Sequence, residues 1–178
     1  NIKFLNLMAV EECGATVEAY TYPPEFAECD GSVEIVPGMF AGQQNRKMFG
    51  MAYRTILGND VDNNDYGYKL HLIYGALAAP SEKGYGTIND SPEPISMSLE
   101  LTTTPVAINT VIDGKKLKPT ACLTFDSTKF DKAFMAKLED ILFGTNPTTE
   151  DDSDGTEARL PLPDEILKLY QESTAAAG

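Results

Sequence analysis

The chain has 178 residues, of which 42% are hydrophobic and 23% are charged, and these values predict a globular domain and not a disordered chain. The formal net charge of -13 disfavours specific nucleic-acid binding, because phosphate recognition needs a basic patch. No run of about 18 apolar residues occurs, so we expect no membrane association.

The cysteines are three in number, Cys13, Cys29 and Cys122, and none belongs to a C-x-x-C pair. An odd count without paired spacing argues against a disulfide framework and against a zinc site. We therefore predict free thiols in a reducing compartment.

The first part of the chain alternates between apolar and polar residues, which is typical of strands. Strands are predicted over residues 2–8, 14–20 and 32–36. Pro23 and Pro24 interrupt the pattern after the second of these, and Pro37-Gly38 ends the third.

A long β-hairpin is predicted from residues 47–57 and 66–79, joined by a polar loop rich in Asn and Asp over 59–65. One face of its second strand collects bulky residues: Tyr66, Tyr68, Leu70, Leu72 and Tyr74.

Residues 94–104 alternate with Ile95, Met97, Leu99 and Leu101 on one face, as in a half-buried strand. Residues 106–112 and 117–125 flank Asp113-Gly114, which predicts a second hairpin. The densest basic run lies beside this turn and consists of Lys115, Lys116 and Lys118. We interpret it as a solvated hairpin tip.

The period then changes, because Phe134, Leu138, Ile141 and Leu142 recur at spacings of three and four. This spacing predicts an amphipathic helix over 131–143 that ends at Gly144. Its N-terminal cap is one of three residues: Ser127, Thr128 or Asp131.

Seven to nine strands without βαβ alternation predict a mainly β (α+β) fold, an antiparallel β-sandwich or open barrel with one flanking helix. A single domain is expected over residues 1–178. It includes an acidic surface loop at 145–158 and, within 159–178, a short helix over 164–170 and a frayed tail. We also expect a further segment before Asn1, because the chain starts directly in a strand pattern.

Catalytic machinery is not evident, so we predict no enzyme, no catalytic or metal-binding residue and no cofactor. His71 is the only histidine and lies in a strand pattern, which favours a structural role. No G-x-S-x-G or P-loop motif occurs. The Gly84-Tyr85-Gly86 stretch fails the dinucleotide motif, since Asn89 stands where the last glycine belongs.

The sequence contains acidic clusters that could form a calcium site or a glycosidase carboxylate pair. The first calcium candidate is Asp60, Asp62 and Asn64, and the second is Glu150, Asp152 and Asp154. Position twelve of an EF-hand loop would be His71 in one and Pro161 in the other, so both fail. Glu25, Glu28 and Asp30 lie close in sequence, but nothing else supports a glycosidase.

Four segments in a fixed order carry a family resemblance. They are AYTYPPEFAECDG at 19–31, a stretch over 50–106 that contains YRTILGND, YGYKLHL and TTTPV, KPTACLTFDSTKFDKAFMAKLEDILFG at 118–144, and LPLPDEILKL at 160–169. The series resembles the major tail proteins, or tail tube proteins, of siphophage-like bacteriophages, over nearly the whole chain. The loop at 145–158 is longer than is usual in that family.

The resemblance implies a structural virion protein, assembled in the bacterial host cytoplasm, that self-assembles into stacked hexameric rings. Each subunit would contribute strands to a continuous inner β-barrel, with the helix outside. The implied partners are further copies of the chain, the tape-measure protein and the tail-end proteins. DNA would pass through the lumen without specific binding.

Acidic side chains lining the lumen would repel DNA phosphates, and we state this as a hypothesis for the strongly negative charge. The alternative is a β-sandwich carbohydrate- or receptor-binding module that uses Tyr66, Tyr68 and Tyr74. A hydrolase would depend on His71 alone.

Overall fold

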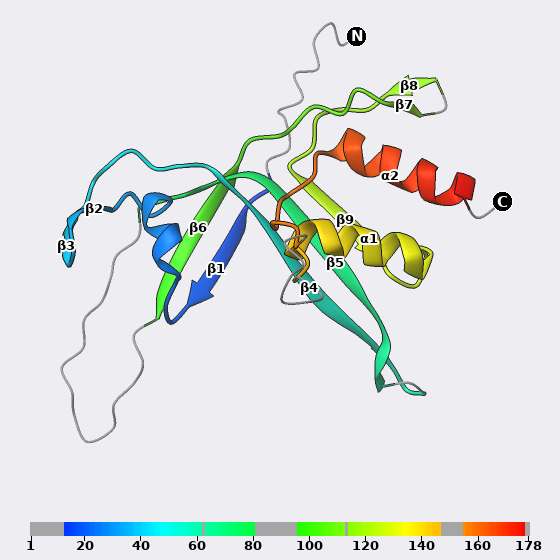
Figure 1. Ribbon diagram of the computed structural model, residues 1–178, viewed down its shortest axis with the longest axis horizontal. Coiled ribbons are helices and arrows are strands. Elements are labelled where there is room, and N and C mark those ends of the chain that lie inside the picture. Colours follow the sequence, from blue (N-terminus) through cyan, green and yellow to red (C-terminus); the bar gives the residue numbers. More distant parts are fainter. Residues whose placement is uncertain (1–12, 62, 81–95, 113, 147–154, 177–178) are drawn as a thin grey trace, which may run out of the picture. The chain divides into compact units, whose positions relative to one another are not determined.

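The computed structural model describes residues 13–61, 63–80, 96–112, 114–146 and 155–176 (Figure 1). Strand residues outnumber helical residues, at 42% against 22%, and the sheets are antiparallel. The predicted mainly β (α+β), antiparallel fold is therefore confirmed, and the described strands do not close into a barrel. Contacts divide the chain into two compact units, Asn1–Lys47 with Leu77–Thr104, and Met48–Ala76 with Pro105–Gly178.

The first unit contains an antiparallel pair, β1 (Ala15–Ala19) and β6 (Met97–Thr103), with Val17 opposite Leu99. Both strands alternate in burial as predicted, and Leu99 is only 4% exposed. An apolar inner face and a polar outer face are what one-sided burial of a sheet requires.

The same unit contains a short 3-10 helix, η1 (Pro24–Glu28), and a hairpin of β2 (Val33–Val36) and β3 (Met39–Ala41). The predicted strand over 32–36 is confirmed, whereas η1 and β3 were not predicted. The turn between the two strands uses Gly38 at φ 85, a left-handed conformation that favours glycine.

The second unit is built on a long hairpin of β4 (Phe49–Asn59) and β5 (Asn63–Ala78), the last two residues of which belong to the first unit. The predicted hairpin is confirmed. Its polar loop is shorter than predicted, because both strands continue into the Asn- and Asp-rich cluster and Asn59 pairs with Asn63.

Strand β9 (Cys122–Asp126) pairs with β5 and not with the preceding segment, so the second predicted hairpin is wrong in extent. That hairpin keeps only its tip, β7 (Val111–Ile112) and β8 (Lys115–Lys116), and an isolated bridge between Val106 and Thr120. Pairing with β5 buries Phe125 to 8% exposure, which a solvent-exposed hairpin would not do.

Helix α1 (Lys132–Phe143) confirms the helix prediction, and Asp131 is its N-cap, accepting a hydrogen bond from the backbone N–H of Ala133. Gly144 follows at φ 72, where an added Cβ would lie 2.4 Å from the Thr156 carbonyl oxygen. Glycine is therefore required at this C-cap by both backbone angle and space.

Helix α2 (Pro163–Ala176) is longer than the predicted 164–170. The hydroxyls of Ser173 and Thr174 donate to the Tyr170 carbonyl, at 2.8 and 3.1 Å. Helix α2 therefore includes part of the tail that was expected to fray, and these side-chain bonds lie within its last turns.

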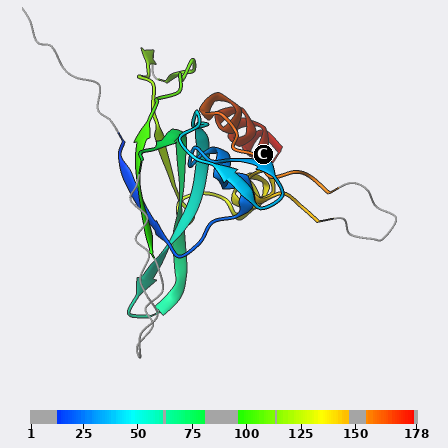
Figure 2. The ribbon, with the colours of Figure 1, turned by 90° about the vertical axis from the view of Figure 1, so that its left-hand side faces the viewer.

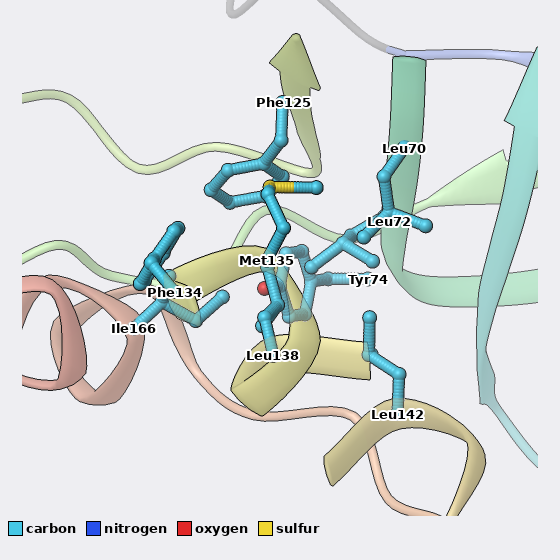
Figure 3. Packing of buried hydrophobic residues seen from close by; sticks show 9 residues of the cluster. All are labelled: Leu70, Leu72, Tyr74, Phe125, Phe134, Met135, Leu138, Leu142 and Ile166. Carbon is cyan, nitrogen blue, oxygen red and sulfur yellow. The ribbon is translucent and has the colours of Figure 1, made fainter. Parts of the chain in front are cut away.

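The core of the second unit lies between β5, β9 and the two helices, which lie on the same side of these strands (Figure 2). Figure 3 shows side chains of β5 and β9 facing those of α1. The cluster consists of Leu70, Leu72, Tyr74, Phe125, Phe134, Met135, Leu138, Leu142 and Ile166. Since Ile166 belongs to α2, both helices contribute to the core, and not α1 alone as predicted.

The start of α2 is fixed by Asp164, whose carboxylate accepts from the backbone N–H groups and side chains of Asn109 and Thr110. These bonds, first the one from the Asn109 backbone N–H, lower the pKa of Asp164 from 3.8 to about 2.

The prediction of three free thiols is wrong for two of them. Cys13 and Cys122 are disulfide-bonded, and Cys29 is a free cysteine. Cysteines far apart in sequence carry no local spacing signal, which is why the chain alone did not indicate this.

Replacing Leu138, which is fully buried, with alanine leaves a cavity in the core, and we expect a loss of about 2–5 kcal/mol of unfolding free energy. Urea denaturation measures this loss. The matched control is Leu162→Ala, since Leu162 is 56% exposed, and its effect should stay within about 0.5 kcal/mol. Equal losses in the two variants would contradict the core assignment.

The lowered pKa of Asp164 stabilises the folded state above pH 3.8, and this contribution is lost as the pH falls towards about 2. Asp164→Asn should therefore be less stable at pH 7 and should change less than the unmodified chain between pH 4 and pH 2. Thermal unfolding across this range tests both. Asp140→Asn, on the exposed side of α1, is the control that should retain the pH dependence.

Candidate functional site

His71 lies in β5 with both ring nitrogens engaged. Nε2 is 2.9 Å from Thr55 Oγ1 on β4, and Nδ1 is 3.1 Å from Thr124 Oγ1 on β9. The ring of Tyr53 stacks on the imidazole at 4.7 Å. These contacts join three strands on the face opposite the helices, so His71 acts here as a cross-strand link.

The carboxylates near η1 are held by separate donors. Glu28 forms an ion pair with Lys47, and Asp30 accepts a hydrogen bond from the Tyr22 hydroxyl at 3.1 Å. Glu25 lies in the first turn of η1. This is not the arrangement of two carboxylates facing each other across a sugar site.

Several other candidates lie outside the described residues, namely Asp62, Glu150, Asp152, Asp154 and the Gly84-Tyr85-Gly86 stretch, and so does the side chain of Asn64. Over the ranges that the structure describes, no group of three His, Cys, Asp or Glu side chains could hold a metal ion.

The three tyrosines considered for glycan binding differ in exposure. Tyr74 is 3% exposed, its hydroxyl donates to the Pro161 carbonyl at 2.8 Å, and burial raises its pKa. Tyr68 is half-buried and donates to Glu139 at 2.5 Å, whereas Tyr66 is 48% exposed. The three rings therefore do not form a shared exposed platform.

A charged clamp joins α1 to the hairpin. Arg54 Nη2 lies 2.6 Å from the Glu139 carboxylate, and the guanidinium lies over the rings of Tyr68 and Phe143, at 4.7 and 5.5 Å. Burial and the bond to Glu139 raise the pKa of Tyr68. The clamp fixes α1 on one face of the sheet and leaves the opposite face uncovered by helix.

The outer edge of β4 pairs with no other described strand. This strand has 11 residues, is terminal in its sheet and pairs only with β5 among the described strands. Ile56 on β4 is 67% exposed. Proteins normally cover, shorten or charge such an edge, because its free backbone groups attract another strand. The stretch of this edge between Phe49 and Asn59 is therefore a candidate assembly surface.

Two small hairpins also expose apolar side chains. On β2–β3 they are Val33, Ile35, Val36, Met39 and Phe40, and near β7–β8 they are Val111, Ile112 and Leu117. Large contiguous patches of exposed apolar side chains usually indicate an interaction site, whereas single exposed apolar residues are common on protein surfaces. The sequence analysis missed the first of these hairpins, although apolar residues on both sides of Pro37-Gly38 were a signal for it.

The charges on the uncovered faces differ between the units. In the second unit Lys69 lies opposite Asp126, so these two charges balance. In the first unit Glu18 and Glu100 lie on the exposed face of β1–β6. Glu18 on β1 and Glu100 on β6 are therefore two described acids that suit a surface repelling DNA.

Comparison of the chain with protein-family models, curated proteins and solved structures returned no match. None of the helices in the described ranges has the length and apolarity needed to cross a bilayer.

Proposed function

We propose that this chain is a tail tube protein, a structural component that self-assembles into stacked rings. The sequence resemblance to major tail proteins supports this, and one structural observation carries it. The observation is that β4 is the terminal strand of its sheet, pairs only with β5 among the described strands and carries Ile56, which is 67% exposed. Enzymatic activity is not part of the proposal.

Both units offer a free strand edge. In the second unit the edge is β4, and in the first unit it is β1, which pairs only with β6 among the described strands. Two different edges allow head-to-tail pairing between copies, and such pairing forms a ring when the rotation closes. Closure removes every exposed edge. The number of six copies comes from the resemblance alone.

In such a ring the helices would lie outside and the uncovered strand faces would line the lumen. The net charge of -13 per copy would repel DNA phosphates, and the exposed Glu18 and Glu100 would contribute to this repulsion. The proposal places the protein in the virion, after assembly in the host cytoplasm, with tape-measure and tail-end proteins as partners.

Purified protein should form rings or tubes with a central hole, visible by electron microscopy across a concentration series, and its mass in solution should rise with concentration. A strict monomer at every concentration and salt, with binding to a glycan array, would instead support the carbohydrate-binding alternative.

Ile56→Lys places a charge on the open edge of β4 and should abolish ring formation while the monomer stays folded, because edge lysines oppose strand pairing. Analytical ultracentrifugation measures the assembly and circular dichroism the fold. Ala136→Lys adds the same charge on the exposed side of α1 and should assemble normally. Normal assembly of the Ile56 variant would exclude β4 as the pairing edge.

A further inference from the structure

The β2–β3 hairpin combines an acid with an apolar surface. Glu34 lies directly opposite Phe40 in the strand pairing, so both side chains lie on one face of the hairpin. All of β2 is exposed, although two strands alone rarely bury enough apolar surface to be stable in water. This hairpin therefore lacks a covering partner among the described residues of its unit.

A groove lies beside this face, with a cavity volume of about 590 Å³. Its lining includes Tyr22, Pro24, Glu28, Val33, Glu34 and Phe40. Two carboxylates thus border an apolar trough, and one of them, Glu28, also forms an ion pair with Lys47. The groove suits an occupant that carries both a cation and an aliphatic side chain.

The β7–β8 hairpin has the complementary pattern. Lys116 lies opposite Val111 and Lys115 lies opposite Ile112, so each face presents one cation and one aliphatic group. All four residues of these strands are exposed. The ion pairs found among the described residues do not include Lys115 or Lys116. Two adjacent lysines on one hairpin form a local positive charge in a chain of net charge -13.

We propose that the β2–β3 face and its groove bind the β7–β8 hairpin of a second copy of this chain. One face of the hairpin would dock, either with Lys116 facing Glu34 and Val111 packing on Phe40, or with Lys115 and Ile112 in these two roles. The two hairpins are different surfaces, so the contact is head-to-tail and repeats from copy to copy. The inference rests on the proposed tail tube function and identifies a contact between copies other than the pairing of strand edges.

Opposite charges across a contact determine which partner binds and how the two surfaces align. Like charges at the same positions weaken the contact strongly. Lys115→Glu combined with Lys116→Glu should therefore weaken self-association about tenfold or more, as measured by sedimentation velocity. Adding Glu34→Lys to this variant should restore part of the association. Lys132→Glu with Lys137→Glu, on exposed positions of α1, makes the same charge change and should have no effect.

Glu34 also accepts a hydrogen bond from the Gly38 N–H at 2.8 Å, so its replacement could alter the turn. Glu34→Gln keeps an acceptor for this bond and removes only the charge. It should weaken association by a smaller factor than the double lysine reversal does. No effect of Glu34→Gln would overturn the proposed pairing.

Carbodiimide cross-linking of a mixture of unlabelled and ¹⁵N-labelled protein provides a second readout at high concentration. We expect mixed-label peptides joining Lys115 or Lys116 to Glu34. The inference would be overturned if Lys115 and Lys116 formed no link to Glu34, or if every such link joined two peptides with the same label, as links within one chain do.

The outcomes separate the two proposals. If the variant with Lys115→Glu and Lys116→Glu assembles as well as the unmodified chain, the hairpin contact is overturned and the tube proposal remains intact. Unchanged assembly together with lost binding to duplex DNA would assign the basic hairpin to nucleic acid, which also overturns the contact. If the unmodified chain forms no rings or tubes but mixed-label cross-links are present, the tube proposal is overturned and the hairpin contact is retained.

Discussion

The packing of α1 against β5 is the interaction on which the second unit depends. Leu70 and Leu72 are fully buried beneath Phe134 and Leu138, and the clamp of Arg54 on α1 holds the helix in register with the hairpin. Because all helical cover lies on one face, the other face and the β4 edge remain accessible. The arrangement that stabilises the monomer therefore also leaves free the surfaces that another copy would need.

The local pattern of apolar and polar residues predicted those helices and strands that are determined by their own residues. The spacing of Phe134 and Leu138 and the cap at Asp131 identified α1, and strict alternation identified β1, β6 and the long hairpin. Local pattern failed where the partner is distant. The choice of β5 over a local hairpin for β9, and the oxidation of Cys13 and Cys122, depend on contacts that no short segment encodes.

The candidate surfaces were less predictable than the fold. Alternation placed Tyr74 and Tyr66 on one face, but only the packed structure shows that the first is buried and the second exposed. His71 was expected to be structural, and the hydroxyls of Thr55 and Thr124 supply the reason. The open edge of β4 had no sequence signal, because an edge is a property of the whole sheet and not of one strand.

Amide hydrogen exchange along β4 tests the central claim most directly. Amides on the outer edge of this strand would become hydrogen-bonded if copies pair through it. Peptides covering Phe49–Asn59 would be compared at concentrations below and above self-association. We expect the β4 amides that do not bond to β5 to exchange quickly at low concentration and to become protected at high concentration, whereas peptides of the buried part of α1 stay protected throughout. Exchange along β4 that is independent of concentration in a sample that assembles would contradict the proposal.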